Sequence, residues 1–105
     1  MKKNLLWSSA LFFSLLLAGT ASAEKSSIEQ GKKLFNDPTL GKSTNDTSCA
    51  SCHPNGKNLE KAGENPKLTK MINRCITGPL KGNKIDGRTT EMRSLKMYIE
   101  SLGDK

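Results

Sequence analysis

The sequence has few aromatic residues, and most of them lie near its beginning. Trp7, Phe12 and Phe13 fall within the first 23 residues, so Phe35 and Tyr98 are the only aromatic residues that follow. A small chain with so few large apolar side chains buries too little surface to form a stable core alone. We therefore expect a bound group to supply part of the core.

The sequence also lacks any convincing β-strand pattern and any internal repeat. Instead, three segments have the apolar spacing of helices. The first predicted helix covers 28–35, and Ser26 and Ser27 before it can cap its beginning. Its residues at helical spacing are Ile28, Gly31, Leu34 and Phe35. Gly31 lowers helix stability, which is tolerable if a second helix approaches closely at that position.

The second predicted helix begins at Pro66, with Asn65 as its cap, and runs to about Ile76. One apolar face of this helix is predicted to contain Leu68, Met71, Ile72 and Cys75. Gly78 and Pro79 end it, and the loop 77–88 follows.

The third predicted helix is capped by Thr89 and Thr90 and extends to about Leu102. Its inner face is predicted to consist of Met92, Leu95, Tyr98, Ile99 and Leu102. The pattern as a whole predicts an all-α fold in which about three helices surround one bound group.

The first 23 residues have the pattern of a cleaved Sec signal peptide. A positive start is followed by the apolar stretch Leu5–Gly19 and a small-x-small cleavage site that ends at Ala23. The apolar stretch is short for a permanent membrane anchor. A lipid anchor is not expected either, because no cysteine lies at the cleavage site. We therefore expect a periplasmic protein whose single domain covers 24–105.

Cys49, Cys52 and His53 form the pattern C-x-x-C-H, which occurs once in the sequence. This pattern is the attachment signature of c-type haem. The two thiols add across the two vinyl groups of haem, and the histidine reaches the iron as its proximal ligand. His53 is expected to be neutral, with one ring nitrogen on iron and the other donating to a backbone carbonyl. The sequence therefore predicts one covalently bound haem c per chain.

Two other interpretations of these residues have less support. A thioredoxin-like pair of Cys49 and Cys52 needs a βαβ context, which the sequence does not show, and it leaves His53 unexplained. A zinc site that combines both cysteines with His53 and Cys75 conflicts with export to an oxidising compartment. The haem interpretation is therefore preferred.

Cys75 is the third cysteine, and it has three interpretations. The first interpretation is a small buried apolar residue, the second is one half of an intermolecular disulfide, and the third is the sixth iron ligand. Met92 is the alternative sixth ligand, although core packing suits its position in the last helix, and Met71 is a weaker alternative. The choice matters, because a methionine ligand raises the reduction potential, whereas a thiolate stabilises ferric iron and lowers the potential.

The arrangement of these residues resembles the class I cytochrome c fold, in which the first and last helices cross near a glycine and an aromatic residue such as Gly31 and Tyr98. The loop 77–88 lacks the methionine that ordinary members carry there. The segment Met71–Cys75, together with Glu91 and Met92, is instead similar to the haem domains of thiosulfate dehydrogenases and to small His/Cys-ligated monohaem cytochromes. That resemblance implies that Cys75 ligates the haem iron.

The function expected from these features is the transfer of single electrons between larger redox proteins, by an electron-transfer protein rather than an enzyme. The net charge of +7, which falls to +5 without Lys2 and Lys3, indicates a solvated basic surface or a docking face for an acidic redox partner. Nucleic acid is not an expected partner, because basic and aromatic residues do not alternate.

Three further possibilities stay open at this point. One alternative function is that of a haem subunit of a thiosulfate-oxidising enzyme, with Cys75 at the iron. Another is the binding of nitric oxide or carbon monoxide. A homodimer, or a heterodimer with a sister cytochrome, is compatible with either function.

Overall fold

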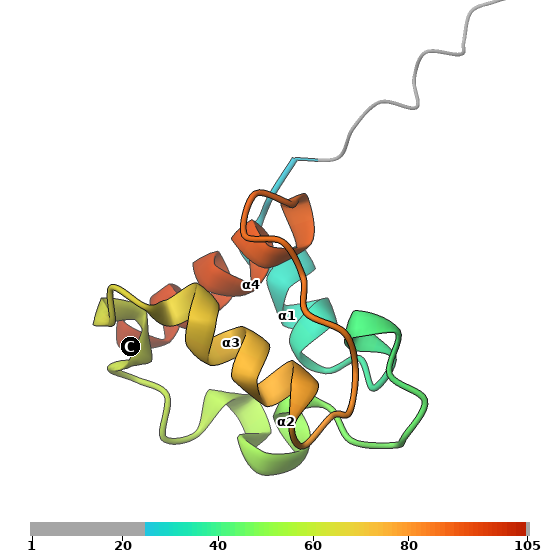
Figure 1. The fold of residues 1–105 in the computed structure, drawn as a ribbon. Coiled ribbons are helices and arrows are strands. Elements are labelled where there is room, and N and C mark those ends of the chain that lie inside the picture. The colour runs from blue at the N-terminus through green and yellow to red at the C-terminus, as the bar shows by residue number, and fades with distance from the viewer. Residues whose placement is uncertain (1–24, 105) are drawn as a thin grey trace, which may run out of the picture.

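The structure of the chain is a computed structural model that describes residues 25–104, and within that range every regular element is helical (Figure 1). The α-helices are α1 (Ile28–Phe35), α2 (Cys49–Cys52), α3 (Leu68–Thr77) and α4 (Thr90–Ser101). Short 3-10 helices occur at Leu40–Lys42, Pro54–Gly56, Ala62–Glu64 and Leu102–Asp104. The predicted all-α fold is confirmed. The predicted signal peptide, 1–23, lies outside the described residues.

Two of the three predicted helix caps are present. The Ser27 hydroxyl accepts a hydrogen bond from the Gln30 amide at 3.0 Å and begins α1. The Thr89 hydroxyl accepts one from the Met92 amide at 3.1 Å and begins α4. Each bond satisfies an amide that has no partner within its own helix.

The predicted start of the second helix is wrong by two residues. Helix α3 begins at Leu68, and Lys67 precedes it without a side-chain cap. The Asn65 side-chain oxygen accepts a hydrogen bond from the Lys67 amide at 2.8 Å, so it closes the turn before the helix rather than the first helical turn. An asparagine before a proline suits both arrangements, because it bonds equally well to a turn amide or a helix amide.

Helices α1 and α4 cross at Gly31, where the sequence predicted a close approach. A Cβ atom at Gly31 would overlap the Ser94 carbonyl group and come within 2.8 Å of the Tyr98 Cβ atom. One turn away, the rings of Phe35 and Tyr98 meet edge to face, with their centroids 5.1 Å apart. The glycine therefore allows the two backbones to touch, and the only two aromatic residues of the described chain support the crossing.

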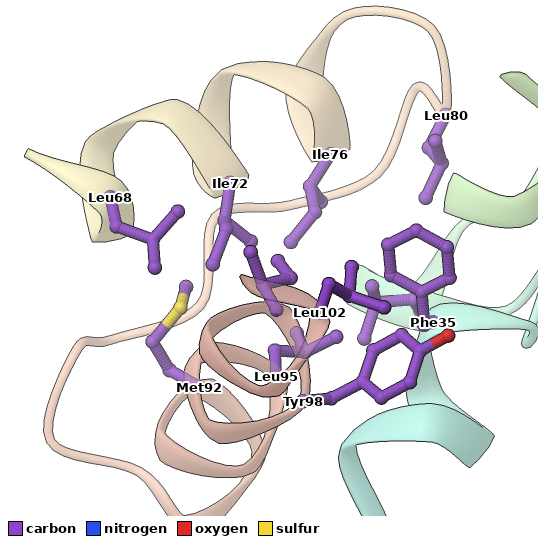
Figure 2. Close-up of a cluster of buried hydrophobic side chains, with 11 residues drawn as sticks. Phe35, Leu68, Ile72, Ile76, Leu80, Met92, Leu95, Tyr98 and Leu102 are labelled. Atoms are coloured by element: carbon purple, nitrogen blue, oxygen red, sulfur yellow. The ribbon is translucent and has the colours of Figure 1, made fainter. Parts of the chain in front are cut away.

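The core lies between this helix pair and α3. Figure 2 shows Leu68, Ile72 and Ile76 extending from α3 toward the side chains of α4. The buried apolar residues of the core are Phe35, Leu40, Leu68, Ile72, Ile76, Leu80, Met92, Leu95, Tyr98, Ile99 and Leu102. Ile28, in the first turn of α1, is 47% exposed. None of the described helices has the length and hydropathy needed to cross a bilayer.

Candidate haem site

A cavity of about 410 Å³ opens between α2, the loop that follows it, and α3. Its volume falls within the range of about 300–1,000 Å³ that is typical of ligand pockets. Leu95 and Ile99 of α4, together with Phe35, form part of its apolar wall. The residues with metal-binding or thioether-forming chemistry on its lining are Cys49, Cys52, His53, Met71 and Cys75.

One wall of the cavity is the C-x-x-C-H segment, which we call the motif wall (residues 49–53). Cys49 and Cys52 lie three residues apart in the single turn of α2, so both thiols can face the cavity from one side of the helix. The Ser51 hydroxyl accepts a hydrogen bond from the Ser48 amide at 2.9 Å and supports the beginning of this turn. Helix α2 was not predicted from the sequence, because four residues are too few to show helical periodicity.

The Cys49 thiol is the more buried thiol of the motif wall. Burial raises the pKa of Cys49 to about 11, and the nearby Cys75 adds to this rise, since a second negative charge close by would be unfavourable. The free thiol is therefore protonated at neutral pH. An apolar, thiol-lined wall of this kind suits a covalently bound apolar group better than a charged one.

The orientation of His53 is set by a backbone carbonyl. Its Nδ1 atom lies 2.9 Å from the Lys57 carbonyl oxygen, and that oxygen can only accept a hydrogen bond. Nδ1 therefore carries the proton, and Nε2 keeps a free lone pair. A carbonyl partner of this kind was expected from the sequence, and it is the usual way in which a protein fixes a metal-binding imidazole.

A second part of the cavity lining, which we call the sulfur wall, is formed by Met71 and Cys75 of α3. The two residues lie one turn apart, and both are exposed. All four residues of the apolar face predicted for this helix line the cavity, so that prediction is confirmed. Within the face, Leu68 and Ile72 are buried in the core, whereas Met71 and Cys75 are not.

Two hydrogen-bonded side chains hold the sulfur wall in place. The Asn65 side-chain amide donates to the Met71 sulfur at 2.9 Å. Asn73 bonds twice to the backbone of Ile85, since its amide donates to the carbonyl at 2.9 Å and its oxygen accepts from the amide at 2.8 Å. The second pair joins the loop 77–88 to α3. Neither asparagine was singled out for these bonds, because both depend on chain segments that only the fold brings together.

The Cys75 thiol has a raised pKa, mainly because it is partly buried and also because Cys52 lies nearby. The guanidinium of Arg74 partly opposes this rise. Burial alone therefore does not favour a thiolate at Cys75, and a positively charged partner in the cavity would be needed to stabilise one.

Met92, the alternative sixth ligand, lies away from the cavity lining. Its side chain is completely buried, and Figure 2 shows it beside Leu68 between α3 and α4. The residues that line the cavity include Met71 but not Met92. If the sixth ligand is a methionine, the cavity lining therefore favours Met71 over Met92.

The residues of this cavity fit a haem group. The lining is mainly apolar, the motif wall offers two thiols and a free imidazole nitrogen, and the sulfur wall offers two further sulfur atoms. Within residues 25–104, no three or more His, Cys, Asp or Glu side chains are grouped so that they could hold a bare metal ion. The interpretation as a zinc site with three cysteines and His53 therefore has no geometric support in the described chain.

Comparison with known proteins points to the same chemistry. The model of a family described as di-haem cytochrome c peroxidase matches residues 25–98, which is most of the chain. No curated protein and no solved structure matched the chain. The family match indicates a domain related to c-type cytochromes, without singling out the haem domains of thiosulfate dehydrogenases.

Proposed function

Because the chain belongs to the di-haem cytochrome c peroxidase family, we propose that it binds haem c and carries single electrons between larger redox proteins. The observation that supports this function is that His53 of the motif wall lines the same cavity as Met71 and Cys75 of α3. An iron held by two protein ligands would have no open position for a substrate, and it would therefore be suited to electron transfer.

Each residue of the cavity has one proposed role. Cys49 and Cys52 hold the haem as thioethers, and His53 binds the iron through Nε2 while its Nδ1 stays bonded to Lys57. Cys75 is the proposed sixth ligand, and Met71 takes the place of Met92 as the alternative. The haem supplies the redox chemistry, and the protein supplies ligation, orientation and an apolar surrounding.

We propose one haem per chain, although the family is named for two. The sequence contains a single C-x-x-C-H pattern, and the described chain contains a single cavity lined by it. Peroxide reduction by this chain alone would need an iron with an open position and a second redox centre. We therefore propose that a second haem, where one is used, belongs to a partner.

The proposed location is the periplasm, after removal of residues 1–23. The support for it is the pattern of the first 23 residues and the chemistry of haem c attachment, which the thiols of an exported chain undergo. The excess of basic over acidic residues supports docking to an acidic redox protein, in a transient pair or with a sister cytochrome.

The proposed function is tested on the haem-loaded protein in both oxidation states. We expect one covalent haem per chain by pyridine haemochrome analysis, six-coordinate low-spin spectra before and after reduction, and rapid electron exchange with a second cytochrome. Hydrogen peroxide should produce no turnover with that cytochrome as donor. A high-spin ferric iron that reduces peroxide would contradict electron transfer and identify a peroxidase.

A second candidate function is a haem subunit of a thiosulfate-oxidising enzyme. The observation that favours it is the exposure of Cys75 at the cavity next to Arg74, whose positive charge would attract an anion. Thiosulfate should then reduce the haem when a partner cytochrome accepts the electrons. Haem that stays oxidised under those conditions, while dithionite reduces it, would exclude this candidate.

A further inference from the structure

One charged side chain on the cavity lining has no role in the function proposed so far. Lys61 lines the cavity, and apart from His53 it carries the only titratable basic group there. Among the described residues that line this cavity, none is Asp or Glu. A cavity that is otherwise apolar therefore presents one cation and no anion to the group that it binds.

Lys61 also has no carboxylate partner within the described chain. The ion pair formed by residues 25–104 joins Arg88 to Asp86 at 2.8 Å, on another part of the surface. Glu60, next to Lys61 in sequence, instead accepts a hydrogen bond from the Asn58 amide at 3.3 Å. The ammonium group is thus left for an external anion.

The backbone that carries Lys61 is well fixed. The Ala62 amide donates to the Leu59 carbonyl at 3.0 Å, and the Asn65 amide donates to the Ala62 carbonyl at 3.1 Å. Gly63 lies directly against α4, where a Cβ atom would come within 2.6 Å of the Glu100 Cα atom. Lys61 is therefore held at the cavity by packing, even though its side chain is exposed to solvent.

We propose that Lys61 is a cofactor-binding residue that pairs with a propionate group of the haem. Haem carries two propionates, which are anionic at neutral pH, and Lys61 is the one lysine whose side chain lines the cavity. This inference rests on the proposed function, because it requires haem in this cavity. The pairing would neutralise part of the negative charge close to the iron.

The pairing has a measurable consequence for the redox equilibrium. A nearby positive charge disfavours the ferric state, which carries one more positive charge than the ferrous state. Lys61→Gln should therefore stabilise ferric haem and lower the equilibrium constant for reduction by a redox mediator. An exposed charge pair typically corresponds to a change of about two- to fivefold.

The test compares Lys61→Gln, Lys61→Arg and a control, Lys70→Gln, in the haem-loaded protein. Lys70 is an exposed lysine of α3 that does not line the cavity, so it matches the lost charge without the proposed contact. Each variant is measured for covalent haem, for the reduction equilibrium with a mediator, and for the propionate bending band in the resonance Raman spectrum.

We expect Lys61→Gln to keep its covalent haem, lower the reduction constant two- to fivefold and shift the propionate band. Lys61→Arg should restore both values, and Lys70→Gln should change neither. A Lys61→Gln protein that behaves like Lys70→Gln, or that changes the equilibrium without the propionate band, would overturn the pairing. A wild-type chain without covalent haem would instead contradict the proposed function, so the two failures can be told apart.

Discussion

The two walls of the cavity are encoded in different ways. The motif wall, 49–53, is a run of consecutive residues in which local geometry alone brings two thiols and an imidazole together. The sulfur wall consists of Met71 and Cys75, and their side chains reach the cavity only because Leu68, Ile72 and Ile76 occupy the core. A local motif tolerates changes elsewhere in the chain, whereas a wall made by packing depends on all the contacts that position its helix.

The largest expected effect is on covalent haem attachment, which should depend on the motif wall and not on the sulfur wall. Replacing both Cys49 and Cys52 by serine should abolish covalent haem attachment, and the small chain should lose its cooperative unfolding transition with the loss of that part of its core. Cys75→Ser is the matched control, since it removes a thiol from the other wall and should keep one haem per chain. Haem content by pyridine haemochrome and thermal unfolding by circular dichroism measure both effects. Covalent haem in the double variant would remove the thioether assignment.

The next effect concerns which sulfur atom reaches the iron. Cys75→Ser should remove thiolate signals from the ferric electron paramagnetic resonance spectrum and raise the reduction potential by on the order of 0.1–0.3 V, within the span of about 0.8 V that axial ligands cover. Met71→Leu should leave the ferric spectrum unchanged. The opposite pattern, with a methionine-type near-infrared band that disappears in Met71→Leu, would assign the sixth position to Met71. A band that neither variant changes would return Met92 to consideration.

A smaller effect is expected at the helix crossing that supports both walls. Gly31→Ala forces its new methyl group into the Ser94 carbonyl, and it should reduce the free energy of unfolding by about 1–3 kcal/mol. The spectra of the haem should stay unchanged, because neither Gly31 nor the Ser94 group that its new methyl would meet lines the cavity. Denaturant unfolding of the haem-loaded protein measures the loss. Gly87→Ala, where the nearest atom is the Thr69 methyl at 3.2 Å, should lose clearly less.

The smallest expected effect follows from removing the hydrogen bonds that hold the sulfur wall in place. Asn73→Ala leaves the Ile85 amide and carbonyl without their partner, which typically costs about 1–3 kcal/mol for each buried group and less where water can reach it. We expect a loss of about 1 kcal/mol in the free energy of unfolding, with unchanged haem content and a small shift in the ferric spectrum. Asn83→Ala, at an exposed asparagine of the same loop, is the control. Equal losses in both variants would mean that Asn73 does not hold α3 in place.

Several features of the fold were correctly predicted because they depend on neighbouring residues. Ser27 and Thr89 cap their helices as expected, since a cap needs only the amide three residues ahead. The close approach at Gly31 was also predictable, because a glycine inside an amphipathic helix is unfavourable without a packing reason.

The features that could not be predicted involve competition between residues of similar character. Ile28 is as apolar as the residues of the core, yet its side chain is 47% exposed. Apolar spacing correctly placed Cys75 and Met71 on one face with Leu68 and Ile72, but periodicity does not tell which residues of such a face are buried and which stay exposed. Lys61 had no signal at all, since lysines occur throughout the sequence.

The sequence by itself determined the helical class, two of the three cap positions and the grouping of the motif-wall residues, because each of these depends on residues within a few positions of one another. Only the tertiary structure decided that Met71 rather than Met92 lines the cavity, that Cys75 shares this cavity with the motif thiols, and that one lysine lines it. Those outcomes depend on how α3 and the loop before it pack on α4, and this packing brings together residues that are far apart in the chain.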